Sequence, residues 1–126
     1  MSEHDDAVMF DGILAEVLAE AERSIAKHGD QRNIPMGTGP NVLPLDLGTP
    51  VYRQFSAGRL ADLATQATDS RSFSKGDGTV TWRDILTEEV FEAYAEDDPA
   101  ALRAELIQVA AVAVKMIDAI DHTPSA

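Results

Sequence analysis

Apolar residues recur at helical spacing near the start of the chain. Within residues 7–27 one stripe holds seven of them: Phe10, Ile13, Leu14, Val17, Leu18, Ala21 and Ile25. This spacing predicts an amphipathic helix. The stretch "KHGD" then supplies a stop signal, with two basic residues in the last turn and Gly29 after them. A Gly- and Pro-rich loop follows over about residues 29–48, and its length predicts a flexible segment.

Start signals mark three further helices, which the pattern places at residues 50–68, 81–96 and 99–121. Each signal pairs a capping residue with a proline or an acid: Thr49 with Pro50, Thr81 with Asp84, and Asp98 with Pro99. The polar stretch "DSRSFSKGDGT" is a turn region before the third helix, and residues 122–126 form a frayed tail. Because "DDPA" makes a very short connection, the last two helices are expected to form an antiparallel hairpin.

The pattern therefore predicts an all-α fold, a four-helix bundle within one domain over residues 1–126. Hydrophobic residues make up 44% and charged residues 25% of the chain, which is ordinary for a globular protein. A chain of this length buries a modest core, so we expect oligomerisation to complete it. The chain has no cysteine, no basic region of a signal peptide and no apolar run near the roughly 20 residues that span a bilayer. We expect a cytoplasmic protein with no membrane partner.

Charge narrows the possible partners. The chain carries 10 Lys and Arg against 22 Asp and Glu, a net charge of −12. This charge repels nucleic acid phosphates and speaks against a nucleic acid partner. A phosphorylated small molecule remains compatible, because divalent cations held by carboxylates can invert the local field.

Several of these acids share a helix face with apolar residues. On a helical wheel Glu89 falls inside the apolar sector of the third helix, with Glu92 at its edge and Glu88 beyond it. Glu105 falls inside the apolar stripe of the fourth helix, and Gln108 and Lys115 follow on its edge. Across a hairpin the rise per residue puts Glu92 level with Glu105. The wheel thus gathers Glu88, Glu89, Glu92, Glu105 and Gln108 at one inward-facing patch.

Half-buried carboxylates that cluster need compensation, because they repel one another and lose hydration. Divalent metal is one solution, and hard oxygen ligands favour Mg²⁺, with Mn²⁺ as a plausible substitute. A buried polar network and the acidic flank of an oligomer interface are the alternatives. A di-iron carboxylate bundle needs Glu-x-x-His pairs, and none of the three histidines lies in the hairpin.

The acidic spacing resembles a known family. "EEVFE" followed after twelve residues by "ELIQ" is similar to the E-E-x-x-E…E-x-x-D signature of MazG-like all-α nucleoside triphosphate pyrophosphohydrolases. "ERSIAKHGDQ" with "PMGTG" resembles a further conserved-looking region of that family, and the hairpin resembles its actinobacterial and phage branch, which includes the MazZ type. Together these stretches cover most of the chain.

The resemblance implies roles for individual residues. Glu88 and Glu89 take catalytic roles, with Glu88 as a further ligand or the base that orients water. Glu89, Glu92, Glu105 and Gln108 take the metal positions, and Gln108 stands where the family has a final Asp. His28 stands where the family more usually has Trp. In such enzymes Mg²⁺ ions hold the triphosphate and water attacks the α-phosphorus, which gives a monophosphate and pyrophosphate.

Six residues are candidate substrate contacts: Lys115, Lys27, His28, Gln31, Trp82 and Arg59. Lys115 would reach a phosphate, and Arg59 or Arg53 is proposed for the same task on charge alone. The first-helix residues Lys27 and His28 are most simply explained as partners of a helix C-terminus, whereas the resemblance implies a nucleotide contact. Trp82 would either pack in the core or stack on a base.

The sequence thus predicts a Mg²⁺-dependent pyrophosphohydrolase that acts on a nucleoside triphosphate, with dGTP as the first choice. A non-enzymatic helical interaction module, whose acids tune an interface, is the alternative. The resemblance further implies a homo-dimer or a homo-tetramer.

Overall fold

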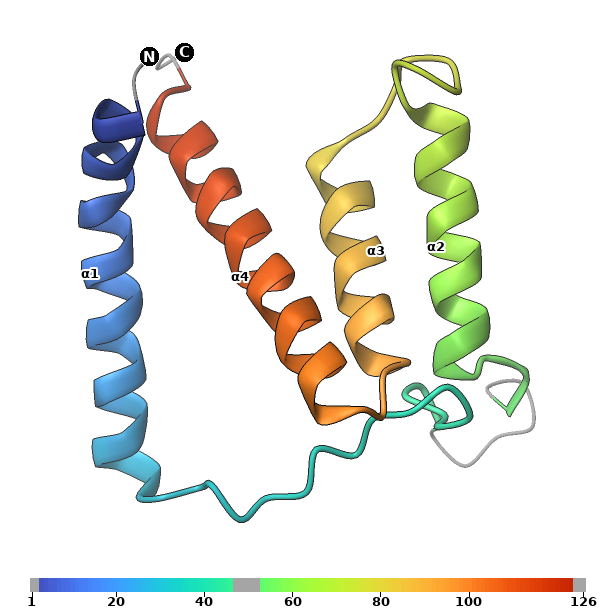
Figure 1. The fold of residues 1–126 in the computed structure, drawn as a ribbon, viewed down its shortest axis with the longest axis horizontal. Helices are drawn as coiled ribbons and strands as arrows, with labels where there is room; N and C mark the ends of the chain where they lie inside the picture. The colour runs from blue at the N-terminus through green and yellow to red at the C-terminus, as the bar shows by residue number, and fades with distance from the viewer. Residues whose placement is uncertain (1–2, 47–52, 124–126) are drawn as a thin grey trace. The chain divides into compact units, whose positions relative to one another are not determined.

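The computed structural model describes residues 3–46 and 53–123, with side chains from residue 10 onward in the first helix. These residues form four helices and no strand: α1 (Glu3–His28), α2 (Ala57–Arg71), α3 (Trp82–Tyr94) and α4 (Pro99–Asp121) (Figure 1). The all-α class is therefore confirmed. Across the described ranges, no helix is both long enough and apolar enough to cross a bilayer.

The chain divides into two compact units. The first unit is Met1–Met36 with Ala113–Ala126, and the second unit is Gly37–Val112. The first unit contains α1 and the C-terminal end of α4. The second unit contains α2, α3 and the N-terminal part of α4. The single domain expected over residues 1–126 stays a prediction.

The first helix ends where the sequence predicts. The backbone N–H of Gly29 donates to the carbonyl of Ile25 (2.8 Å), and Gly29 has φ 74°. A left-handed residue directly after the last turn is the usual way for glycine to end a helix. Lys27 and His28 lie in that last turn.

The second helix begins later than predicted. It starts at Ala57, and Ser56 is its N-cap, with its hydroxyl accepting from the N–H of Arg59 (3.2 Å). The expected cap Thr49 and first residue Pro50 lie outside the described residues, but a continuous helix over residues 50–68 is wrong. The predicted start rested on a local Thr-Pro signal. The observed start depends on tertiary packing, because Ala57 is fully buried.

The third helix follows its predicted start. Thr81 is the N-cap, and the Thr81 hydroxyl and the Asp84 side chain form a reciprocal capping box. Asp84 is only 6% exposed and pairs with Arg71 from the end of α2. The Thr81 N–H, the Thr81 hydroxyl and the Arg71 guanidinium hold the pKa of the Asp84 carboxyl below its usual value. The cap of α3 therefore also ties α3 to α2.

Residues 95–98 join α3 to α4. The Asp98 carboxylate accepts from the N–H of Ala101 (2.9 Å), which confirms Asp98 as the N-cap before Pro99. The short connection agrees with the expected hairpin.

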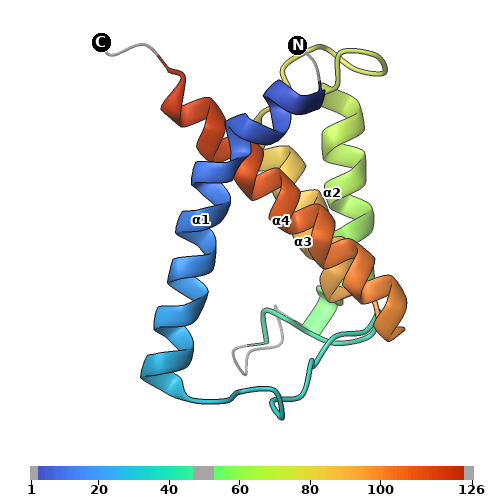
Figure 2. The ribbon, with the colours of Figure 1, turned by 60° about the vertical axis from the view of Figure 1, so that its left-hand side comes forward.

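Helices α2 and α3 lie side by side (Figure 1 and Figure 2). Their buried apolar residues are small: Ala57 and Ala64 on α2, and Ala93 on α3. Small side chains let the two backbones approach closely. Among the described residues no large side chain is fully buried, so the core of one chain is thin. Oligomerisation stays a prediction.

Residues 37–46 are tied to both neighbouring helices. The N–H of Ala57 donates to the carbonyl of Val42 (2.8 Å), and the N–H of Gly39 donates to the carbonyl of Tyr94 (2.8 Å). This part of the long predicted loop is thus fixed to the start of α2 and the end of α3.

Candidate functional site

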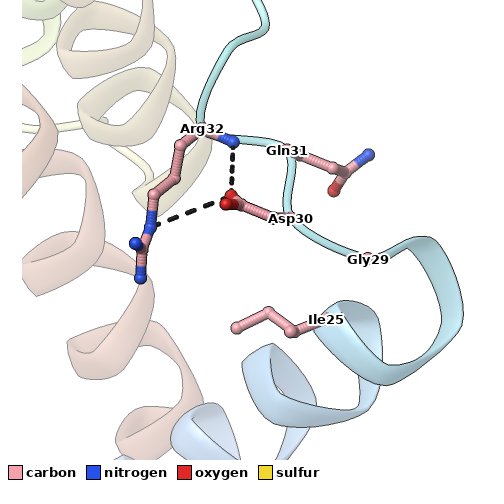
Figure 3. Close-up of a pocket in the computed structure, with 5 residues that line it drawn as sticks. All are labelled: Ile25, Gly29, Asp30, Gln31 and Arg32. Atoms are coloured by element: carbon pink, nitrogen blue, oxygen red, sulfur yellow. Dashed lines mark hydrogen bonds and ion pairs between the residues drawn. The ribbon is translucent and has the colours of Figure 1, made fainter.

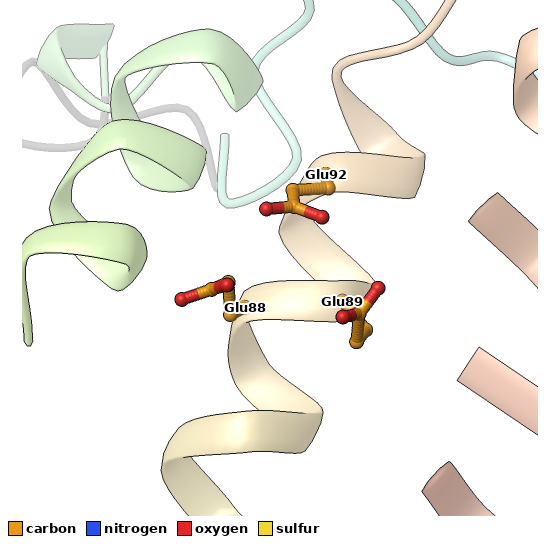
Figure 4. Close-up of side chains that lie close together, drawn as sticks. All are labelled: Glu88, Glu89 and Glu92. Carbon is orange, nitrogen blue, oxygen red and sulfur yellow. The ribbon is translucent and has the colours of Figure 1, made fainter. Parts of the chain in front are cut away.

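Three acids of the predicted patch gather on α3. Glu88, Glu89 and Glu92 each offer a carboxylate oxygen that lies within 4.8 Å of the other two (Figure 4). We call these residues the acidic cluster. Positions i, i+1 and i+4 of a helix place side chains on adjoining turns, so α3 alone creates the cluster. All three side chains are half-buried.

Glu105 of α4 joins the acidic cluster across the turn. The charge and the side chain of Glu105 are among the causes that raise the pKa of the Glu92 carboxyl, so Glu105 acts on this end of the cluster. That Glu92 and Glu105 lie level along the hairpin stays a prediction.

The surroundings of Glu92 disfavour its charged form. Burial, followed by the charges of Glu89, Glu105 and Glu88 and the hydrogen bond with Glu105, raises the pKa of the Glu92 carboxyl from 4.5 to about 7. Glu92 therefore exchanges its proton near neutral pH. A carboxylate that must lose a proton against three like charges is a strong acceptor for a cation.

Glu88 contributes an unsatisfied acceptor. Among the described residues, its Oε2 atom is buried and has no hydrogen-bond partner. Leaving such an atom unpaired costs about 1–3 kcal/mol. Glu88 points from α3 toward the ribbon of α2, and Glu89 projects from the other side of α3 (Figure 4). A cation or an ordered water would satisfy the buried oxygen of Glu88.

The end of α3 adds further negative potential. Glu92 lies two residues before the last residue of α3, whose last turn holds no basic residue. The carbonyl end of a helix carries a partial negative charge. Glu96, Asp97 and Asp98 follow in the sequence. The local field around the acidic cluster therefore favours a divalent cation.

The two other candidate residues on α4 are not part of the acidic cluster. Gln108 lies one turn after Glu105 and is exposed. Lys115 lies farther along α4, is also exposed, and belongs to the first unit. Roles for Gln108 in metal binding and for Lys115 in phosphate binding stay predictions.

The candidate contacts at the end of α1 border a pocket of the first unit. Gln31 lines it together with Ile25, Gly29, Asp30 and Arg32 (Figure 3). The Asp30 carboxylate accepts from the N–H of Arg32 (3.0 Å) and pairs with its guanidinium (3.8 Å). The sequence pointed to Gln31 but missed Asp30 and Arg32, although "GDQR" places them beside the helix stop. Lys27 and His28 are exposed in the last turn.

Three further candidates lie on the surface. Trp82 is the first residue of α3 and is 39% exposed, so the alternative that packs it in the core is wrong. The first turn of α3 buries Asp84 instead, because Asp84 caps the helix and pairs with Arg71. Arg59 lies in the first turn of α2 and is exposed, and the other basic candidate, Arg53, is exposed before α2. Substrate contacts by Trp82 and Arg59 stay predictions.

Sequence reasoning missed the contacts that close the end of α3. Thr38 donates from its hydroxyl to the carbonyl of Glu96 (2.6 Å), and Gly39 donates to Tyr94. The stretch "GTG" signalled a flexible turn, and nothing in its local sequence shows which helix it would contact.

No family model, curated protein or solved structure matches the chain.

Proposed function

We propose that this chain is a Mg²⁺-dependent nucleoside triphosphate pyrophosphohydrolase. The observation that carries the proposal is the clustering of half-buried carboxylates on α3, where burial and the charges of the neighbouring acids raise the pKa of Glu92 to about 7. A metal site explains why a helix would keep Glu88, Glu89 and Glu92 within 4.8 Å of one another. The spacing of these acids and Glu105 also resembles the signature of the MazG-like family.

The residues fit a divalent cation. Glu89, Glu92 and Glu105 would supply hard oxygen ligands, and the buried Oε2 of Glu88 would gain the partner that it lacks among the described residues. When bound, Mg²⁺ would neutralise a triphosphate and lower the pKa of a coordinated water. Glu88 would orient that water and accept its proton. Gln108 would contribute a neutral oxygen where the family has a carboxylate.

The substrate class follows from the resemblance and from the charge. A net charge of −12 repels a triphosphate at long range, and a bound divalent cation would offset this repulsion at the acidic cluster. Within that class we propose a purine deoxynucleotide, dGTP first, as the substrate.

The test incubates the full chain with Mg²⁺ or Mn²⁺ and each common NTP and dNTP, and separates pyrophosphate from orthophosphate by ion-exchange chromatography. We expect pyrophosphate and a monophosphate, and a loss of about a hundredfold or more in Glu89→Gln, because removing even an outer partner of a metal ligand costs about 10–100-fold. Glu22→Gln, on an exposed residue of α1, is the matched control and is expected to keep full activity. Orthophosphate as the first product would contradict the proposal.

One observation favours a second candidate, a non-enzymatic helical interaction module. The apolar residues of α1 are unusually open: Leu14 is 50%, Leu18 60% and Ile25 62% exposed. Such a stripe suits a helical partner. Release of no pyrophosphate from any nucleotide, together with a Glu89→Gln variant that is more stable than the wild type, would favour this module.

A further inference from the structure

The segment of residues 37–42 forms a cap on the C-terminal end of α3, and we call it the capping segment. The last carbonyls of a helix lack partners within the helix. The Thr38 hydroxyl donates to the carbonyl of Glu96 (2.6 Å), and the N–H of Gly39 donates to the carbonyl of Tyr94 (2.8 Å). The capping segment therefore supplies a donor to the last carbonyl of α3 and a second donor to the turn that follows it.

The capping segment is itself held by α2. The N–H of Ala57 donates to the carbonyl of Val42 (2.8 Å), and the N–H of Gly58 donates to the carbonyl of Pro40 (2.9 Å). A Cβ atom at Gly58 would come within 3.1 Å of the Pro40 oxygen, so the contact is close. Because α2 also packs against α3, the segment is braced at both ends.

These contacts of the capping segment act on the turn that joins the helices of Glu92 and Glu105. Glu92 lies two residues before Tyr94, and Glu105 follows the turn of residues 95–98. Gly39 lies close to this turn, since a Cβ atom added at Gly39 would lie 3.8 Å from the Cβ atom of Asp97. The hydrogen bond from Thr38 to Glu96 is thus a side-chain contact that holds the turn between the two acids from outside it.

We propose that Thr38 is a positioning residue for the metal site. Its hydroxyl holds the turn of residues 95–98 so that Glu92 and Glu105 can bind one cation together. Thr38 itself does not touch the cation. This inference rests on the proposed function, because it presumes that the acidic cluster and Glu105 hold a divalent cation.

The test measures Mn²⁺ binding to the full chain by electron paramagnetic resonance, which follows the loss of the free-ion signal. Thr38→Val removes the hydroxyl at nearly constant shape, and Thr38→Ser keeps it. We expect Thr38→Val to bind Mn²⁺ about fivefold more weakly, the effect of one hydrogen bond, and Thr38→Ser to bind like the wild type. If Thr38→Val does not fold by circular dichroism, Thr38→Ala takes its place.

The matched control is Thr68→Val. The Thr68 hydroxyl donates to the carbonyl of Ala64 (3.1 Å) and to that of Asp84 (3.4 Å), at the other end of α3. We expect this variant to lose stability and to keep Mn²⁺ affinity, which separates positioning from general loosening.

Three outcomes would overturn the inference while leaving the proposed function intact. They are an unchanged affinity in Thr38→Val, an equal loss in Thr38→Ser, and an equal loss in Thr68→Val. A wild-type chain that binds no Mn²⁺ would instead defeat the proposed function, and the positioning role with it.

Discussion

The pKa of the Glu92 carboxyl is set by the burial of this side chain and by the acids around it. Its pKa in the folded protein is about 7, against an ordinary value of 4.5. Between these values the folded protein holds a proton that the unfolded chain has released. The stability that this proton contributes is fully present below about pH 4.5 and is lost as the pH rises through about 7. Burial of the Glu92 carboxyl is the largest cause of this shift, followed by the charges of Glu89, Glu105 and Glu88.

This linkage predicts the behaviour of Glu92→Gln in the absence of metal. At pH 8 the variant is expected to be more stable than the wild type by about 1 kcal/mol, a value reduced for the screening of half-buried charge. At pH 5 the gain is expected to be smaller, because wild-type Glu92 is then protonated. Urea unfolding at the two pH values measures the difference. Glu22→Gln is the control, and an equal gain at both pH values would contradict the prediction.

The sequence alone predicted which acids lie together on α3, but not how deeply each one is buried or what it contacts. A helical wheel suffices to place Glu88, Glu89 and Glu92 together, because three residues of one helix keep a fixed relation. The buried oxygen of Glu88 depends on how α3 meets its neighbours, and no local pattern encodes that. For the same reason the sequence left a core position open for Trp82, although this residue is 39% exposed in the first turn of α3.

The helix starts that have a capping motif in the local sequence were predicted best. Thr81 with Asp84 and Asp98 with Pro99 fix the starts of α3 and α4, and both signals act within four residues. The start of α2 was misplaced, because the helix begins at Ala57 with Ser56 as its cap, and the burial of Ala57 depends on tertiary packing that no local signal encodes. The contacts of Thr38 escaped notice for the same reason, since they join positions 58 residues apart.

The turn between α2 and α3 offers a test at the scale of an element. A Cβ atom at Gly76 would lie 2.1 Å from the carbonyl oxygen of Ser70, so Gly76→Ala must displace the backbone. We expect a loss of about 2 kcal/mol, the usual effect of forcing an extra methyl group into a packed site. Thermal unfolding followed by circular dichroism provides the measurement.

Gly12→Ala is the matched control for this substitution. Gly12 lies within α1, and a Cβ atom there meets nothing within 4 Å. Alanine is the better helix former by about 1 kcal/mol, so this change is expected to stabilise the chain. If both alanines shifted the unfolding temperature in the same direction, the close approach at Gly76 would not control the turn.

For the whole molecule, the thin core and the open stripe of α1 bear on association. Among the described residues no large side chain is fully buried, while Leu18 and Ile25 are 60% and 62% exposed. A chain of 126 residues that leaves such residues in water would gain stability if it paired with a second copy. The predicted dimer or tetramer would provide that cover.

Leu18→Glu tests this association. A charge placed in an apolar interface is costly to desolvate, so the variant is expected to shift the protein toward the monomer. Analytical ultracentrifugation at several concentrations measures the mass of the particles. Phe73→Glu is the control, because Phe73 is 82% exposed in the turn before α3 and lies outside the stripe. A monomeric wild type, or equal effects of the two variants, would contradict the expected association.

Because the connection between α3 and α4 is short, the acids of the candidate site lie close together in the sequence. Changes of chain length elsewhere therefore do not alter their spacing. All four carboxylates, from Glu88 to Glu105, are encoded within eighteen consecutive codons. Insertions and deletions outside that block leave the spacing of the acids intact. A single extra residue between Pro99 and Glu105 would instead rotate Glu105 by about 100° around the axis of α4 and turn it away from Glu92. Insertions and deletions in related sequences are therefore expected to lie outside residues 88–105.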